Sequence, residues 1–136
     1  VSLMILRAVI SRDASWRVQE SLAQAFNTYC KTTGYERALP TIIDWLGDES
    51  PNVRRAVTEG LRIWTAKPYF KDHPLEAVML LSQHRADRSE YLRKSIGNAL
   101  RDISRKHPDL VRDELARWNL ADERTAFTHQ LAAKFL

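Results

Sequence analysis

Four cationic side chains recur at matching positions of two similar segments, and cations in this pattern suit the binding of a phosphate backbone. Arg55 and Arg62 in the first segment correspond to Lys94 and Arg101 in the second. On a helical wheel of about 100° per residue, they fall away from the apolar side chains. If these helices line one concave surface, the cations form basic rows along it, as a polyanion requires. The alternative is that charged outer faces simply meet water, although solvation does not require the same position in each segment.

Three carboxylates lie among these cations or at their edge. Glu20 and Glu59 fall on the same helical faces as the basic rows, and Asp102 follows Arg101 directly. Each has a structural alternative. Glu20 suits a solvated helix surface, Glu59 suits an ion pair with Arg55 one turn away, and Asp102 suits a bond to a neighbouring backbone.

Helical periodicity extends almost from end to end and predicts the elements that hold these side chains. Longer helices are expected around residues 16–26, 53–64 and 92–103, and shorter ones over residues 38–46, 75–81 and 110–118. The sequence offers start signals at candidate N-caps and first-turn prolines, namely Ser15, Ser89, Pro51, Pro74 and Pro108. Gly34 suits the end of the first long helix.

An internal repeat defines the expected fold. The segment 48–62 matches the segment 87–101 position for position, with Asp48 corresponding to Asp87, and a fainter copy begins near Asp13. Helix pairs repeating every ~33–47 residues denote an α-solenoid, and Asp, Val and Arg at the start of the second helix are typical of HEAT repeats.

We therefore expect an all-α, HEAT-like α-solenoid, a superhelix of antiparallel helix pairs in one domain over residues 1–136. Its repeats are expected at about 13–47, 48–86 and 87–120, with a C-terminal helix over 121–136 that caps the stack or begins a fourth repeat. Residues 1–10 read as part of an apolar helix without a cap, so we expect a fragment that lacks N-terminal repeats.

Composition excludes several classes. Of the 136 residues, 44% are hydrophobic and 28% are charged, which is typical of a globular domain. The net charge of +4 is compatible with a nucleic-acid partner. One cysteine, Cys30, excludes a disulfide framework and fits a reducing compartment. No apolar run reaches the ~20 residues of a membrane span. We expect a cytoplasmic monomer with no membrane partner.

The pattern of motifs also argues against a metal or cofactor. The four histidines, His73, His84, His107 and His129, lack the paired spacing of metal ligands. The sequence has no glycine-rich phosphate loop, nucleophile elbow or dinucleotide fingerprint. An ATPase, a zinc hydrolase and a serine hydrolase are therefore not expected, and neither is a small-molecule cofactor.

Three blocks of this sequence resemble a known family, the HEAT-like-repeat DNA glycosylases of bacterial alkylation repair (the AlkC/AlkD group). The blocks are Ser-Trp-Arg-Val-Gln-Glu at 15–20, Val-Arg-Arg-Ala-Val-Thr-Glu-Gly at 53–60, and residues 89–108, beginning Ser-Glu-Tyr-Leu-Arg-Lys-Ser. The second and third blocks are closer to AlkC. The similarity spans about residues 15–118.

The resemblance implies roles for the carboxylates. The family excises cationic alkylated purines such as 3-methyladenine and 7-methylguanine from duplex DNA, and a carboxylate stabilises the sugar cation that forms. Glu20 matches the family's catalytic acid in a Trp-x-x-x-acid arrangement with Trp16, which would contact the sugar or, alternatively, belong to the core. Glu59 and Asp102 match a second and a third family acid.

The resemblance also assigns the basic residues to DNA binding: Arg55 and Arg62 match family positions beside the acids, and Lys94 and Arg101 extend the same rows. The implied activity is an alkylpurine DNA glycosylase, with the reservation that missing repeats would leave this chain inactive. The alternatives are a non-catalytic HEAT scaffold for DNA or protein, and an adaptor that binds protein alone. Trp64 is expected in the core rather than on a sugar, and Trp45 and Trp118 in packing.

Overall fold

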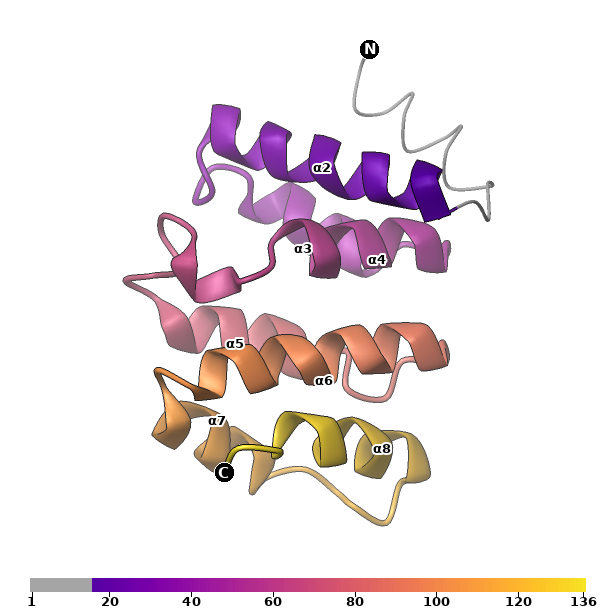
Figure 1. Cartoon of the computed structure of the whole chain (residues 1–136), viewed down its shortest axis with the longest axis vertical. Coiled ribbons are helices and arrows are strands. Elements are labelled where there is room, and N and C mark those ends of the chain that lie inside the picture. Colours follow the sequence, from indigo (N-terminus) through magenta and orange to yellow (C-terminus); the bar gives the residue numbers. More distant parts are fainter. Residues whose placement is uncertain (1–15) are drawn as a thin grey trace. The chain divides into compact units, whose positions relative to one another are not determined.

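The described part of the chain, residues 16–136 in a computed structural model, is helical and contains no strand (Figure 1). For Trp16 only the backbone is described, and the candidate cap Ser15 and the predicted helix over residues 1–10 lie outside the described residues. The chain divides into two compact units, one ending at Arg62 and the other spanning Ile63–Leu136. Each unit has its own core.

The first unit packs α2 (Trp16–Thr33), α3 (Leu39–Leu46) and α4 (Pro51–Gly60) around apolar side chains. Fully or almost fully buried are Leu22, Phe26, Cys30, Ile42, Trp45, Val53 and Val57. The Phe26 and Trp45 rings lie 4.7 Å apart between centroids and join α2 to α3. Burial raises the pKa of the Cys30 thiol to about 12, because the thiolate would lose its hydration.

Two contacts fix how α2 and α4 meet. The Gln19 side-chain amide donates to the Asn52 side-chain oxygen at 2.9 Å, and farther along both helices Gly60 lies against the backbone of Ala23. The contacts advance in the same order along both helices, so α2 and α4 run in the same direction, as Figure 1 also shows. We call this line of contact the α2–α4 seam.

The turns before α4 and α6 share one local design, at equivalent positions of the internal repeat. The Asp48 carboxylate accepts from the Ser50 N–H at 2.8 Å, and Arg54 donates to the Asp48 carbonyl at 2.8 Å. Asp87, Ser89 and Arg93 make the same contacts at 2.8 and 2.7 Å. These bonds satisfy backbone groups ahead of each helix and fix the direction in which it starts. Arg54 and Arg93, which follow Val53 and Leu92, are therefore structural.

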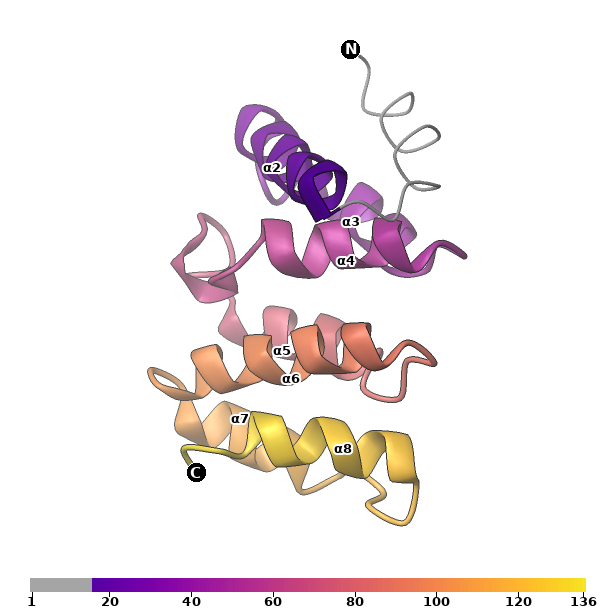
Figure 2. The same cartoon turned by 45° about the vertical axis from the view of Figure 1, so that its right-hand side comes forward.

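The second unit contains the short 3₁₀ turn η1 (Trp64–Ala66) and the helices α5 (Pro74–Ser82), α6 (Glu90–Ser104), α7 (Pro108–Leu115) and α8 (Glu123–Ala132). Its apolar core includes Trp64, Phe70, Leu81, Leu92, Ile96, Leu100 and Ile103. Turning the view by 45° leaves α6 and α8 side by side (Figure 2).

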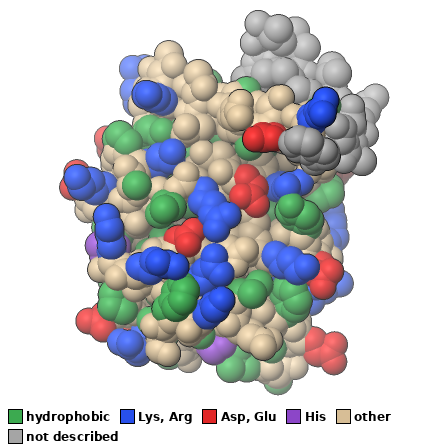
Figure 3. All heavy atoms as spheres, in the orientation of Figure 1, with side chains coloured by type: hydrophobic (Ala, Val, Ile, Leu, Met, Phe, Trp, Pro, Cys, Tyr) green, Lys and Arg blue, Asp and Glu red, His purple; other side chains and the backbone are tan. Residues whose placement is uncertain are grey.

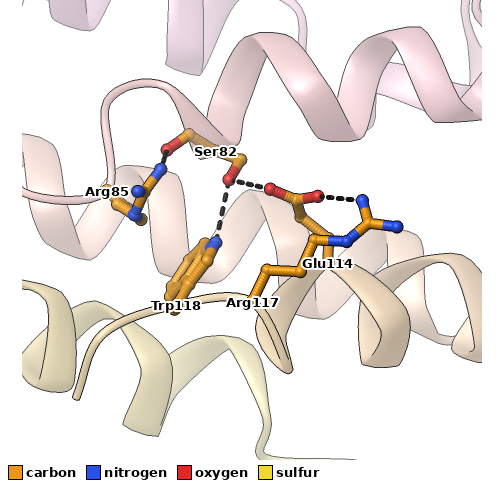
Figure 4. Close-up of polar contacts among 5 residues, drawn as sticks. All are labelled: Ser82, Arg85, Glu114, Arg117 and Trp118. Carbon is orange, nitrogen blue, oxygen red and sulfur yellow. Dashed lines mark hydrogen bonds and ion pairs between the residues drawn. The ribbon is translucent and has the colours of Figure 1, made fainter.

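A buried polar network joins α5 to α7 in this unit (Figure 4). The Ser82 hydroxyl donates to the Glu114 carboxylate at 2.6 Å and accepts from the Trp118 indole N–H at 2.8 Å. The second Glu114 oxygen lies 3.3 Å from Arg117, and the Arg85 guanidinium lies 5.7 Å from the centre of the Trp118 ring. Because each buried polar group has a partner, the network stabilises this interface instead of penalising it.

The predicted start and stop signals are largely confirmed. The Ser89 hydroxyl accepts from the Leu92 N–H, and all three predicted prolines begin their helices. Gly34 ends α2 with φ of 97°, a left-handed conformation that favours glycine.

The predicted extent of α4 was wrong, because the helix ends at Gly60 and does not continue to Trp64. Beyond it, Trp64 begins the 3₁₀ turn and packs on Phe70 with centroids 5.3 Å apart. The C-terminal helix is also shorter than predicted.

Within the described residues no helix is long and apolar enough to cross a membrane. No three His, Cys, Asp or Glu side chains of this same part gather where they would hold a metal ion.

Candidate nucleic-acid interface

Glu20 and Glu59 lie on the same side of the α2–α4 seam. Glu20 follows the seam residue Gln19 on α2, and Glu59 precedes the seam residue Gly60 on α4. When two right-handed helices run side by side in the same direction, the residue that follows a contact residue on one helix projects to a particular side. The residue that precedes a contact residue on the other helix projects to that same side. The two predicted acids therefore share a surface of the first unit.

Arg55 belongs to the same surface. It lies one turn before Glu59 on α4 and is half-buried, whereas Glu20 is exposed. A cation on the same surface as two carboxylates reduces their mutual repulsion, and such a mixed surface suits a phosphate beside a cationic group.

Arg62 differs from its prediction, because it lies beyond the end of α4. Its guanidinium reaches back to within 3.9 Å of the Glu59 carboxylate, with side chains 40% and 30% exposed respectively. A pair this open to solvent contributes little to stability. Arg62 therefore neutralises part of the Glu59 charge instead of extending a helical row.

The second unit carries the other predicted residues on α6. Lys94 is exposed, and Figure 3 shows Lys and Arg side chains gathered over this helix. Arg101 and Asp102 are more enclosed, with side chains only 21% and 12% exposed and 4.0 Å between the guanidinium and the carboxylate. Asp102 is thus the most enclosed of the three predicted acids.

The predicted site residues are divided between the two units. Glu20, Arg55, Glu59 and Arg62 belong to the first unit, and Lys94, Arg101 and Asp102 belong to the second. The side chain of Trp16 lies outside the described part. The tryptophans predicted in packing, Trp45, Trp64 and Trp118, are all buried.

Three neighbours of Arg101 were not among the predicted site residues. Arg105, Lys134 and Phe135 surround it at the ends of α6 and α8. Arg105 continues the four-residue spacing from Arg101 and was visible in the sequence. Lys134 and Phe135 gave no such signal, because only the packing of α8 on α6 brings them there.

Helix pairs in this order, with acids and cations on their free faces, define the HEAT-like helical-repeat class, and the all-α prediction is confirmed. The sequence matches the DNA alkylation repair enzyme family over residues 2–134. The chain therefore belongs to that family.

Several solved structures are similar to this chain. The crystal structure of smu.31 from Streptococcus mutans UA159 is 51% identical with a TM-score of 0.96, and 98% of this chain covers 67% of that one. AlkD2 from Streptococcus mutans matches with the same identity and TM-score over 65% of its length. Pseudomonas fluorescens AlkC, an alkylpurine DNA glycosylase bound to DNA containing an abasic site analogue, is 26% identical with a TM-score of 0.70, and 97% of this chain covers 41% of it.

A curated relative, the uncharacterized protein YhaZ of Bacillus subtilis strain 168, is 33% identical over 87 residues. The match takes in 61% of this chain and about a quarter (24%) of YhaZ.

Proposed function

We propose that this chain binds duplex DNA through the free faces of α4 and α6 and releases cationic alkylated purines from it. The observation that carries the proposal is the grouping of Glu20 and Glu59 on one side of the α2–α4 seam, with Arg55 one helical turn before Glu59. Family membership and the likeness to AlkC, whose solved structure contains DNA with an abasic site analogue, support it.

The chemistry needs few protein groups. In a cationic alkylated purine the C1′–N bond is already weak, and when it breaks its electron pair passes to the base, which leaves neutral. The sugar becomes an oxocarbenium ion, and a nearby carboxylate stabilises that charge. Water then adds to C1′ and loses a proton, which a carboxylate accepts. Glu20 and Glu59 of the first unit are the groups assigned to these steps, and Arg55 holds a phosphate beside them. In the second unit, Lys94 is assigned to another phosphate, and Asp102 is the third candidate acid.

The test is release of methylated purines from alkylated duplex DNA. Glu20→Gln and Glu59→Gln keep side-chain size and remove the charge, so each is expected to slow release by about 10²-fold. Glu36→Gln is the matched control, since Glu36 is an exposed acid in the turn after α2. Equal rates for Glu20→Gln, Glu59→Gln and Glu36→Gln would remove the catalytic assignment.

One contact favours a second candidate, a DNA-binding scaffold without catalysis. The Glu59 carboxylate already has a cationic partner in Arg62 at 3.9 Å, and Glu20 is open to water, so neither charge is held in a dry site. The scaffold predicts that the unmodified protein binds duplex DNA and releases no base. Loss of binding in Arg55→Gln would then locate its interface on the same surface.

A further inference from the structure

We propose that Arg101, Arg105 and Lys134, gathered around the ring of Phe135, form a binding site for a phosphate of the DNA backbone. The inference rests on the DNA-binding part of the proposed function and adds a site at the C-terminal ends of α6 and α8. Arg105 lies 4.5 Å from the ring centre, and Lys134 and Arg101 lie at 5.8 and 5.9 Å.

The packing of α8 on α6 creates this cluster. The Arg93 guanidinium lies 5.1 Å from the centre of the Phe127 ring, and Gly97 lies against Leu131 so closely that a Cβ would fall 2.8 Å from the Leu131 Cβ. Arg101 meets Phe135 with the same separation along the chain as these two pairs. The contacts between α6 and α8 thus advance four residues at a time on both helices, and in the turn that follows α8 the next such contact places Phe135 beside the cations.

An anion is the ligand that fits this charge distribution. Three cations surround the ring, and one carboxylate, that of Asp102, lies 4.0 Å from Arg101. The negative face of an aromatic ring attracts each cation and offsets part of their mutual repulsion. Arg105 and Lys134 remain exposed, so their charged ends are available to a ligand.

The ring also holds the cations in place. The Arg101 side chain is 21% exposed and its Nε is buried, so the atoms packed around its stem restrict its movement. Side chains that are already ordered lose less conformational entropy when a ligand binds. Phe135, itself 50% exposed, is therefore a positioning residue for the cations around it.

Duplex DNA supplies the phosphate in this proposal, because the cluster continues a basic face of α6 that begins at Lys94. From Lys94 to Arg105 that face extends about 16 Å at 1.5 Å per residue, longer than one small anion needs. Inorganic phosphate, at an ionic strength matched with chloride, is therefore expected to displace little DNA.

The experiment measures binding of a fluorescein-labelled undamaged duplex by fluorescence anisotropy over a range of salt concentrations. Arg105→Gln and Lys134→Gln are each expected to weaken binding about five- to tenfold at 0.1 M salt and to lower the slope of log K against log salt by about 0.9. Arg112→Gln on α7 removes the same charge from an exposed side chain and is expected to change affinity less than about twofold.

Phe135→Leu tests the ring without a change of charge. Phe135→Leu is expected to weaken DNA binding. Phe135→Tyr, which keeps an aromatic ring, is expected to bind DNA as the unmodified protein does. Thermal melting of every variant checks that the fold is intact.

The results that would contradict this site can be distinguished from those that would contradict the proposed function. Binding that depends on Arg55 and Lys94, but not on Arg105 and Lys134 beyond the Arg112→Gln control, overturns this site and leaves the proposed function standing. Displacement of DNA by inorganic phosphate at matched ionic strength overturns the assignment to a DNA phosphate. No binding of duplex DNA by the unmodified protein overturns both this site and the proposed function.

Discussion

Gly60 lies so close to Ala23 that a Cβ at Gly60 would fall 2.6 Å from the Ala23 carbonyl oxygen. Real side chains do not approach backbone at that distance, so α2 and α4 meet here only because Gly60 has no side chain. The same contact sets the distance between the helices that carry Glu20 and Glu59. A substitution at Gly60 therefore tests the packing on which the candidate site depends.

Gly60→Ala is expected to destabilise the protein by about 1–3 kcal/mol, because the added methyl group forces α2 and α4 apart. The expected sign is informative, since alanine ordinarily favours a helix over glycine by about 1 kcal/mol. Urea unfolding measures the change. Gly47→Ala is the control, because a Cβ there lies at an ordinary 3.7 Å from its nearest neighbour. Equal stability of the two variants would contradict the close approach.

Ser82→Ala is expected to cost about 1–3 kcal/mol, since it removes a partner from both the Glu114 carboxylate and the Trp118 indole N–H inside the second unit. Ser104→Ala is the matched control, because the Ser104 hydroxyl is also buried but donates only to the Arg101 carbonyl of its own helix. Chemical denaturation distinguishes them. A loss no larger than that of Ser104→Ala would show that the network contributes little.

Arg54→Gln and Arg55→Gln remove the same charge from adjacent residues, but the first is expected to lower stability and the second to weaken DNA binding. Arg54 is 5% exposed and donates to the Asp48 and Glu49 carbonyls, so its loss is expected to cost about 2 kcal/mol of stability. Arg55→Gln is expected to change stability by less than about 0.5 kcal/mol and to weaken DNA binding. Thermal melts and anisotropy on both variants test the pair, and reversed effects would contradict these assignments.

The stability of the fold is expected to depend on pH through the Asp122 carboxyl group. The Thr125 hydroxyl and backbone N–H donate to its carboxylate at 2.7 and 2.9 Å and hold the pKa of Asp122 below its ordinary value of 3.8. A carboxyl whose pKa is lower in the folded state stabilises the fold above its ordinary pKa, and this stability is lost as the pH falls through the lower value. The melting temperature is expected to fall more steeply below about pH 4 than that of Asp122→Asn. Parallel curves would rule out this contribution.

The repeat and its helices were predictable because their signals are local. The match between the segments 48–62 and 87–101, the prolines that begin α4, α5 and α7, and the cap at Ser89 each depend on a few neighbouring residues. The buried tryptophans followed from apolar periodicity. The end of α4 was not predictable in this way, because Leu61 and Trp64 continue the helical pattern although the chain leaves the helix after Gly60.

The candidate site was predictable only in part. Residue type and repeat position selected Glu20, Arg55 and Glu59, and the α2–α4 seam places them on one side. Sequence position alone gave Arg101 and Lys94 the same role, yet Arg101 is largely enclosed beside Phe135 and Lys94 is exposed. That difference arises from the packing of α8 on α6, where Gly97 lies against Leu131.

The burial of Cys30 has a consequence for a protein of alkylation repair. Methylating agents react with thiolates as well as with purines, and the thiolate, not the thiol, is the reactive form. With its pKa raised to about 12 and no exposed surface, the single thiol of this chain is almost entirely protonated at neutral pH and out of reach. The folded protein is thereby protected, at its one cysteine, from the electrophiles that damage DNA.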